Sequence, residues 1–137
     1  MTPLGLAVGQ KARRSKTVTA RDVELYAEIT GDRNPLHFDP AFAAGTRFGR
    51  LVAQGGITSG MLNALVAMDL PGPGTVFMSQ TLKYLAPTYL GDTLTAEVEV
   101  LSVKPDKPVC QLKATVTNQD GTGVLEGECW TYTMRPA

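Results

Sequence analysis

Two stretches in the second half of the chain alternate strictly between apolar and polar residues, and this alternation constrains the fold more than any other feature. Because successive side chains of a β-strand point to opposite faces, each stretch predicts a strand with one packed face and one face in water. Two further strand-like runs, 75–85 and 123–134, flank them, and the short turn-rich segments between the runs favour antiparallel pairing. The alternating apolar positions are Leu94, Ala96, Val98, Val100, Cys110, Leu112, Ala114 and Val116.

A segment without charged residues, 57–68, precedes these strands and predicts a buried helix, because a helix that is apolar on most sides is usually covered by other elements. Earlier, the basic residues of 8–18 are typical of an edge strand whose charges discourage unwanted pairing, although a site for an anionic ligand is the alternative. We therefore predict an α+β fold, in which one curved antiparallel sheet of about five strands packs against a central buried helix.

The composition narrows the class of protein. A chain of 137 residues predicts a single domain over residues 1–137. With 13 basic and 13 acidic residues the net charge is zero, which argues against binding to nucleic acid or to an anionic membrane surface. We find neither a membrane-spanning apolar run nor the pattern of a signal peptide, and we expect a cytoplasmic protein.

The metal-binding residue types do not form a metal-site pattern. Cys110 and Cys129 stand in apolar, strand-like surroundings, which predicts free buried thiols. One histidine and two remote cysteines are too few for a zinc site, and the Asp32 to Asn34 spacing lacks the later ligands of a calcium loop. We expect neither a metal nor a cofactor.

The only histidine, His37, stands in the stretch Thr-Gly-Asp-Arg-Asn-Pro-Leu-His-Phe at 30–38, directly after a predicted helix. Thr19 and Asp22 predict the start of that helix, and Gly31 its end. The proline restricts the turn that follows, so the carboxylate of Asp32 and the imidazole are presented together. Such a pair can act as general acid and general base on one water molecule. Capping and structural roles are, however, the more frequent explanation of these residue types.

Gly55 stands where the buried helix is expected to start, after a segment, 39–53, that we predict to be a semi-ordered overhang with one short turn. A glycine there can expose a backbone N–H at the positive end of the helix dipole, which suits a developing oxyanion. An acid–base pair combined with an oxyanion donor fits chemistry next to a carbonyl group.

The residues from Thr30 to Asp39, followed by Ala44, Phe48 and Gly55, resemble the hydratase motif of the MaoC-like family, which includes the (R)-specific enoyl-CoA hydratases. The resemblance extends over almost the whole chain and implies a hot-dog fold, in which an antiparallel sheet wraps a central helix. It also implies cofactor-free, reversible hydration of a trans-2-enoyl thioester to an (R)-3-hydroxyacyl thioester. Asp32 and His37 would act as the catalytic pair, and Asn34 would orient them.

In the same resemblance the Gly55 N–H would polarise the thioester carbonyl, and Gly56, Leu36 and Phe48 would contact substrate. The family often has His-Gly and a large apolar residue here, whereas this chain has Gln54, Gly55 and Gly56, so either glycine can be the donor. The implied partners are an acyl-CoA or acyl-carrier-protein thioester and a second copy of the chain, in a homodimer or larger assembly with sites at the interface. Three cations are candidates for contact with coenzyme A phosphates: Arg47, Arg50 and Lys83.

Two alternative functions share the predicted fold. A thioesterase usually has an acidic residue on or near the central helix, and residues 57–68 contain none. A non-catalytic module would bind acyl thioesters tightly without turnover, and the presence of both Asp32 and His37 argues against it.

Overall fold

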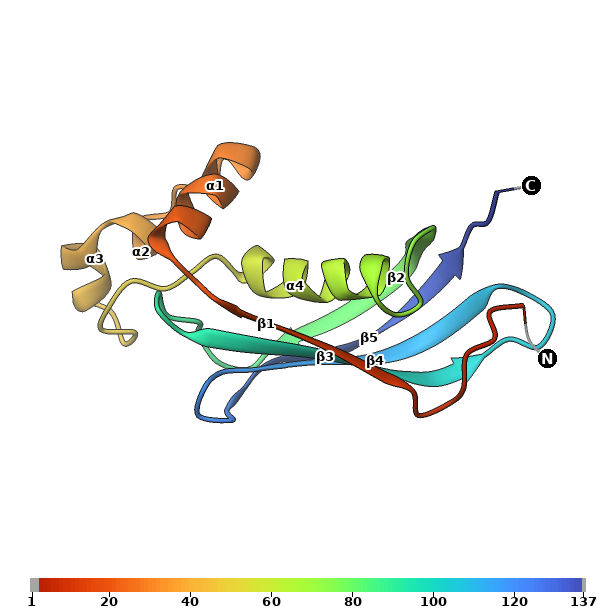
Figure 1. Cartoon of the computed structure of the whole chain (residues 1–137). Coiled ribbons are helices and arrows are strands. Elements are labelled where there is room, and N and C mark those ends of the chain that lie inside the picture. Colours follow the sequence, from red (N-terminus) through yellow and green to blue (C-terminus); the bar gives the residue numbers. More distant parts are fainter. Residues whose placement is uncertain (1–2, 137) are drawn as a thin grey trace.

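The computed structural model describes residues 3–136, whose strands form one antiparallel sheet that curves along a single long helix (Figure 1). The sheet order is β1-β3-β4-β5-β2, and every neighbouring pair is antiparallel. The predicted α+β arrangement of about five strands around a buried helix is confirmed. The strands are β1 (Lys11–Thr17), β2 (Thr75–Tyr84), β3 (Thr93–Val103), β4 (Val109–Thr117) and β5 (Gly123–Thr133).

The central helix, α4 (Gly55–Met68), packs on the apolar face of the sheet that the alternating pattern predicts. The four apolar positions of β3 are fully buried, and they share one core with Leu62, Leu65 and Val66 of α4. The helix begins at Gly55, two residues earlier than predicted. Between residues 3 and 136, no helix combines the length and apolar character needed to cross a bilayer.

The two cysteines are free and buried in this core, as predicted. Burial raises the pKa of the Cys110 thiol to about 11 and that of the Cys129 thiol to about 12. Both side chains therefore stay protonated near neutral pH and act as small apolar residues.

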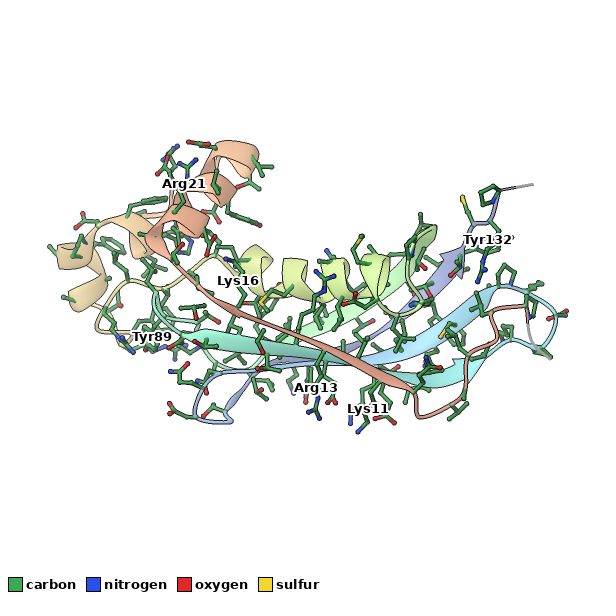
Figure 2. All side chains as sticks on the ribbon, in the orientation of Figure 1. Lys11, Arg13, Lys16, Arg21, Tyr89 and Tyr132 are labelled. Atoms are coloured by element: carbon green, nitrogen blue, oxygen red, sulfur yellow. The ribbon has the colours of Figure 1, made fainter. Side chains whose placement is uncertain are left out.

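Strand β1 forms one edge of the sheet, and each of its four cations lies next to a carboxylate. Figure 2 shows Lys11 and Arg13 on the sheet face opposite α4 and Lys16 on the helix side. Hydrogen bonding from Arg14 holds the pKa of Asp69 below its ordinary value. This pairing supports a charged edge rather than an anion site. The pairs are Lys11–Glu99, Arg13–Glu97, Arg14–Asp69 and Lys16–Asp22.

The predicted strand 8–18 is shorter in the structure, because residues 7–10 form a turn in which Gln10 N–H donates to the Ala7 carbonyl. The helix that follows, α1 (Ala20–Thr30), has the complete capping box of Thr19 and Asp22, and Gly31 ends it with φ 82°. These local predictions are confirmed.

The segment after α1 contains two short helices, α2 (Pro35–Phe38) and α3 (Pro40–Ala44). Both extend beyond the sheet at the end where α4 begins, and α1 stands over that end on the side of α4 (Figure 1). The one short turn expected within the overhang 39–53 is α3, and the Asp39 carboxylate caps it through the Phe42 N–H at 3.1 Å. An isolated antiparallel β-bridge between Val52 and Tyr89 joins the end of the segment to the loop between β2 and β3.

Candidate active site

Asp32 and His37 face one another across the turn between α1 and α2. The His37 Nε2 lies 3.7 Å from Asp32 Oδ1, and the side chains are 10% and 42% exposed, respectively. The His37 Nδ1 lies 2.7 Å from the Val52 carbonyl oxygen. Because a carbonyl only accepts, Nδ1 carries the hydrogen, and Nε2 of the neutral ring is left as an acceptor. The site therefore combines a half-exposed carboxylate with a buried, oriented imidazole.

Asn34 holds the turn that carries both groups. Its Oδ1 accepts from the Leu36 N–H at 3.0 Å and caps α2, while its own N–H donates to Asp32 Oδ1 at 3.3 Å. The Asn34 side chain is thus occupied by the helix start, and it reaches Asp32 only through the backbone. Pro35 is the first residue of α2, where its missing N–H costs no hydrogen bond.

Arg33 stands next to Asp32 in sequence, but its guanidinium pairs with a carboxylate of α1. It donates to Glu24 at 3.0 Å and lies 5.6 Å from the centroid of the Phe38 ring. The hydrogen bond from Arg33 holds the pKa of Glu24 below its ordinary value. Arg33 therefore ties the turn to α1.

A cavity of about 390 Å³ adjoins the first turn of α4. Three predicted site residues line it, namely Leu36, Phe48 and Gly55, together with Arg47, Thr58 and Tyr84. Asp32, His37 and Gly56 are not among its lining residues. A second cavity of about 390 Å³ opens on β2, β4 and β5 and includes Lys83, so this cation lies apart from Arg47.

The two glycines at the start of α4 face different tyrosines. A Cβ on Gly55 would lie 2.9 Å from Cε1 of Tyr84, on the cavity side. A Cβ on Gly56 would lie 1.8 Å from the Tyr26 hydroxyl. Gly55 and Gly56 are the first two residues of the helix, where neither N–H has an intrahelical carbonyl to bond, but Gly55 lines the cavity and Gly56 does not. This geometry favours Gly55 over Gly56 as the donor toward the cavity.

Gly56→Ala is expected to destabilise the fold by about 1–3 kcal/mol, because the added methyl must displace the ring of Tyr26. Chemical denaturation measures the change. Gly60→Ala is the matched control on the same helix, since a Cβ there meets nothing within 4 Å, and it is expected to stabilise by about 0.5–1 kcal/mol. Equal stability of Gly56→Ala and the wild type would contradict the close contact.

Several contacts of the site escaped prediction because the residues that make them are distant from one another in sequence. The Val52 carbonyl that fixes the histidine tautomer is a backbone group, and no side-chain pattern reports it. Gln54 is buried beside α1, and Tyr84 comes from the end of β2. Within residues 3–136, no three His, Cys, Asp or Glu side chains are grouped so as to hold a metal ion.

Comparison with known proteins identifies the family. Residues 6–123 match the sequence model of the MaoC like domain. The chain is 41% identical over 128 residues to an (R)-specific enoyl-CoA hydratase of Aeromonas caviae, covering 93% of this chain and 96% of the relative. It is 31% identical over 125 residues to a mitochondrial 3-hydroxyacyl-[acyl-carrier-protein] dehydratase of Solanum lycopersicum, covering 90% and 74%.

A solved structure is similar over the same extent. The (R)-hydratase from A. caviae involved in PHA biosynthesis superimposes with a TM-score of 0.91 at 39% identity, covering 95% of this chain and 98% of that one. The hot-dog fold expected from the motif is therefore confirmed. By its matched domain and its relatives, the chain belongs to the MaoC-like domain family.

Proposed function

We propose that the protein is an (R)-specific enoyl-CoA hydratase, a hydro-lyase that reversibly adds water to a trans-2-enoyl thioester. One observation carries the proposal: the acceptor Nε2 of His37 lies 3.7 Å from the Asp32 carboxylate. That distance exceeds a direct hydrogen bond, and one water can contact both groups. The names of the relatives support the same reaction.

The pair would handle the protons of a single water. The water oxygen forms a bond to C3 of the enoyl group as one O–H bond breaks and its proton passes to the pair. The C2–C3 π electrons move toward the thioester carbonyl, and C2 then takes a proton from the pair. Asp32 and His37 end in their starting protonation state.

Gly55 would stabilise the charge that develops on the thioester oxygen. Its N–H is the first of α4, lacks an intrahelical partner, and stands at the positive end of the helix dipole. An N–H that is already oriented toward developing charge is worth about 2.7–4 kcal/mol in comparable oxyanion sites. The glycine lines the cavity in which the thioester would lie.

Hydration of crotonyl-CoA, followed as loss of the enoyl absorbance, tests the proposal. We expect turnover without release of free thiol. Thiol release would instead identify a thioesterase, and tight binding of acyl-CoA without either reaction would identify a binding module. A panel of enoyl-CoA chain lengths guards against a wrong choice of substrate, and inactivity toward all of them would contradict the proposal.

We propose that Arg47 and Arg50 bind the phosphates of coenzyme A, the acyl carrier of the proposed substrate. Arg47 lines the cavity, and Arg50 lies 4.0 Å from the ring centroid of Tyr89, whose hydroxyl donates to the Phe48 carbonyl. Tyr89 lies at the α1–α3 end of the molecule (Figure 2). Neither arginine forms an ion pair with any carboxylate of residues 3–136, so both can meet phosphate groups.

Arg47→Ala is expected to raise KM for crotonyl-CoA about tenfold, since a hydrogen bond to a charged group is worth about 1.5 kcal/mol. KM for crotonyl-pantetheine, which lacks the nucleotide phosphates, should stay unchanged. Arg13→Ala is the control, because Arg13 lies on the sheet face opposite α4 (Figure 2). Equal increases in KM for both thioesters would contradict a phosphate contact.

We also propose a homodimer formed through β2. This strand is the second edge of the sheet and pairs only with β5 among the described strands. Its Val76 and Met78 are 44% and 60% exposed, and Met68 at the end of α4 is exposed as well. An edge strand that exposes large apolar side chains is suited to pairing with a second copy. Light scattering should give about twice the 14.6 kDa chain mass, and a monomer would contradict the proposal.

A cytoplasmic location is part of the same proposal. It is supported by the two cysteines, which are unpaired in the core, since thiols in reducing compartments stay free.

A further inference from the structure

The side chain of Gln54 connects the two halves of the proposed site. It is fully buried, and its Nε2 lies 3.0 Å from the Val23 carbonyl oxygen and 3.4 Å from the Asp32 carbonyl oxygen. Its backbone leads directly into Gly55, the first residue of α4. Gln54 therefore contacts the backbone of the residue whose carboxylate would bind water, and it directly precedes Gly55, whose N–H would bind the thioester.

The orientation of the Gln54 amide follows from its neighbours. Both contacts of Nε2 are carbonyl oxygens, which only accept, so the NH₂ group must face them. Oε1 then faces away, and it is the buried side-chain polar atom of residues 3–136 that lacks a hydrogen-bond partner. An apolar side chain would fill the same space but would lose both contacts with these carbonyls, so the tie between α1, the Asp32 turn and the start of α4 depends on the amide.

Gln54 also does not act as a capping side chain. It is the N-cap residue of α4, but its side chain accepts no hydrogen bond from the first turn. The amide instead extends to α1 and to the turn before Asn34. The Gly55 N–H is thereby left available at the cavity that this glycine lines.

We propose that Gln54 is a positioning residue that fixes the Asp32 backbone relative to the Gly55 N–H. It would thus align the water with the thioester carbonyl. The inference rests on the proposed hydratase activity. A misalignment of about 1 Å between reacting groups can cost about 10²-fold in rate, so loss of this tie should appear in the chemical step.

Gln54→Met and Gln54→Asn test the proposal in the full-length protein with crotonyl-CoA. Methionine keeps the length but cannot donate, whereas asparagine can donate but is one methylene too short to span the same gap. We expect kcat to fall about 10- to 100-fold in both variants, with KM changed less than about threefold. Because asparagine keeps a polar side chain, Gln54→Asn still tests the effect on kcat if the methionine variant folds poorly.

Gln119→Met is the matched control. The Gln119 amide also makes two hydrogen bonds, to Asp92 at 2.9 Å and from Thr93 N–H at 3.0 Å, but it joins turns outside the site. Each protein is assayed well below its own Tm, so that unfolding does not imitate a lower kcat. Gln119→Met should keep the wild-type kcat.

Wild-type kcat in either Gln54 variant, or a decrease no greater than that of Gln119→Met, would overturn the positioning role while leaving the hydratase activity standing. Absence of turnover in the wild-type protein would instead overturn the proposed function, and this inference with it. The two failures are therefore distinguishable in one set of assays.

Discussion

Asp32→Asn is expected to lower kcat for crotonyl-CoA hydration by about 10²–10⁴-fold, the range that a positioned acid or base contributes. The amide has the size of the carboxylate and its oxygen can still accept from the Asn34 N–H, which Asp32 Oδ1 meets at 3.3 Å. It cannot take a proton from water. Because the Asp32 side chain is 42% exposed, thermal unfolding should change little. Initial rates and a melting curve measure the two effects separately.

Asp120→Asn is the control for that variant, since it makes the same chemical change in the exposed turn between β4 and β5. It should retain wild-type turnover. Activity of Asp32→Asn within a few-fold of Asp120→Asn would remove Asp32 from the proposed mechanism.

His37→Gln is expected to cost a comparable factor in kcat, about 10²–10⁴-fold. Glutamine can donate to the Val52 carbonyl, which His37 Nδ1 meets at 2.7 Å, but an amide does not act as a general acid or base near neutral pH. The His37 side chain is only 10% exposed, so some loss of stability should accompany the change. Denaturant unfolding measures that loss of stability. The kcat of the variant is measured at a temperature at which the variant remains folded, so that the fall in kcat reports catalysis rather than unfolding.

A direct control is available because the chain contains a single histidine. The ring signals of His37 in an NMR spectrum are unambiguous, and they should shift in Asp32→Asn if the two side chains face one another. Unchanged ring signals, or turnover by His37→Gln above about one-tenth of wild type, would contradict the pair.

Features of the fold set by neighbouring residues were predictable. The capping box of Thr19 and Asp22 and the left-handed Gly31 depend on contacts within one turn, and both form as the sequence indicates. The strict alternation of apolar and polar residues in β3 likewise predicts which of its side chains are buried. The predicted start of α4 was two residues too late because glycine disfavours helices, and the close approach of Tyr26 and Tyr84 explains why glycines stand at 55 and 56.

The candidate site likewise contains some contacts that the local sequence predicts and others that join distant parts of the chain. Asp32 and His37 are five positions apart, so one turn brings them together and the motif predicts them. The contacts of Gln54 join residues 31 and 22 positions away, which no local pattern reports. The short turn expected within 39–53 is α3, and its start signal, Asp39 followed by Pro40, is local and present in the sequence.

The central claim is that Asp32 and His37 hydrate an enoyl thioester at the start of α4. Its most direct test is the decrease of enoyl absorbance when crotonyl-CoA is added to the wild-type protein, to Asp32→Asn and to His37→Gln. We expect hydration by the wild type and rates lower by at least about 10²-fold in both variants. Equal rates in all three proteins would contradict the claim.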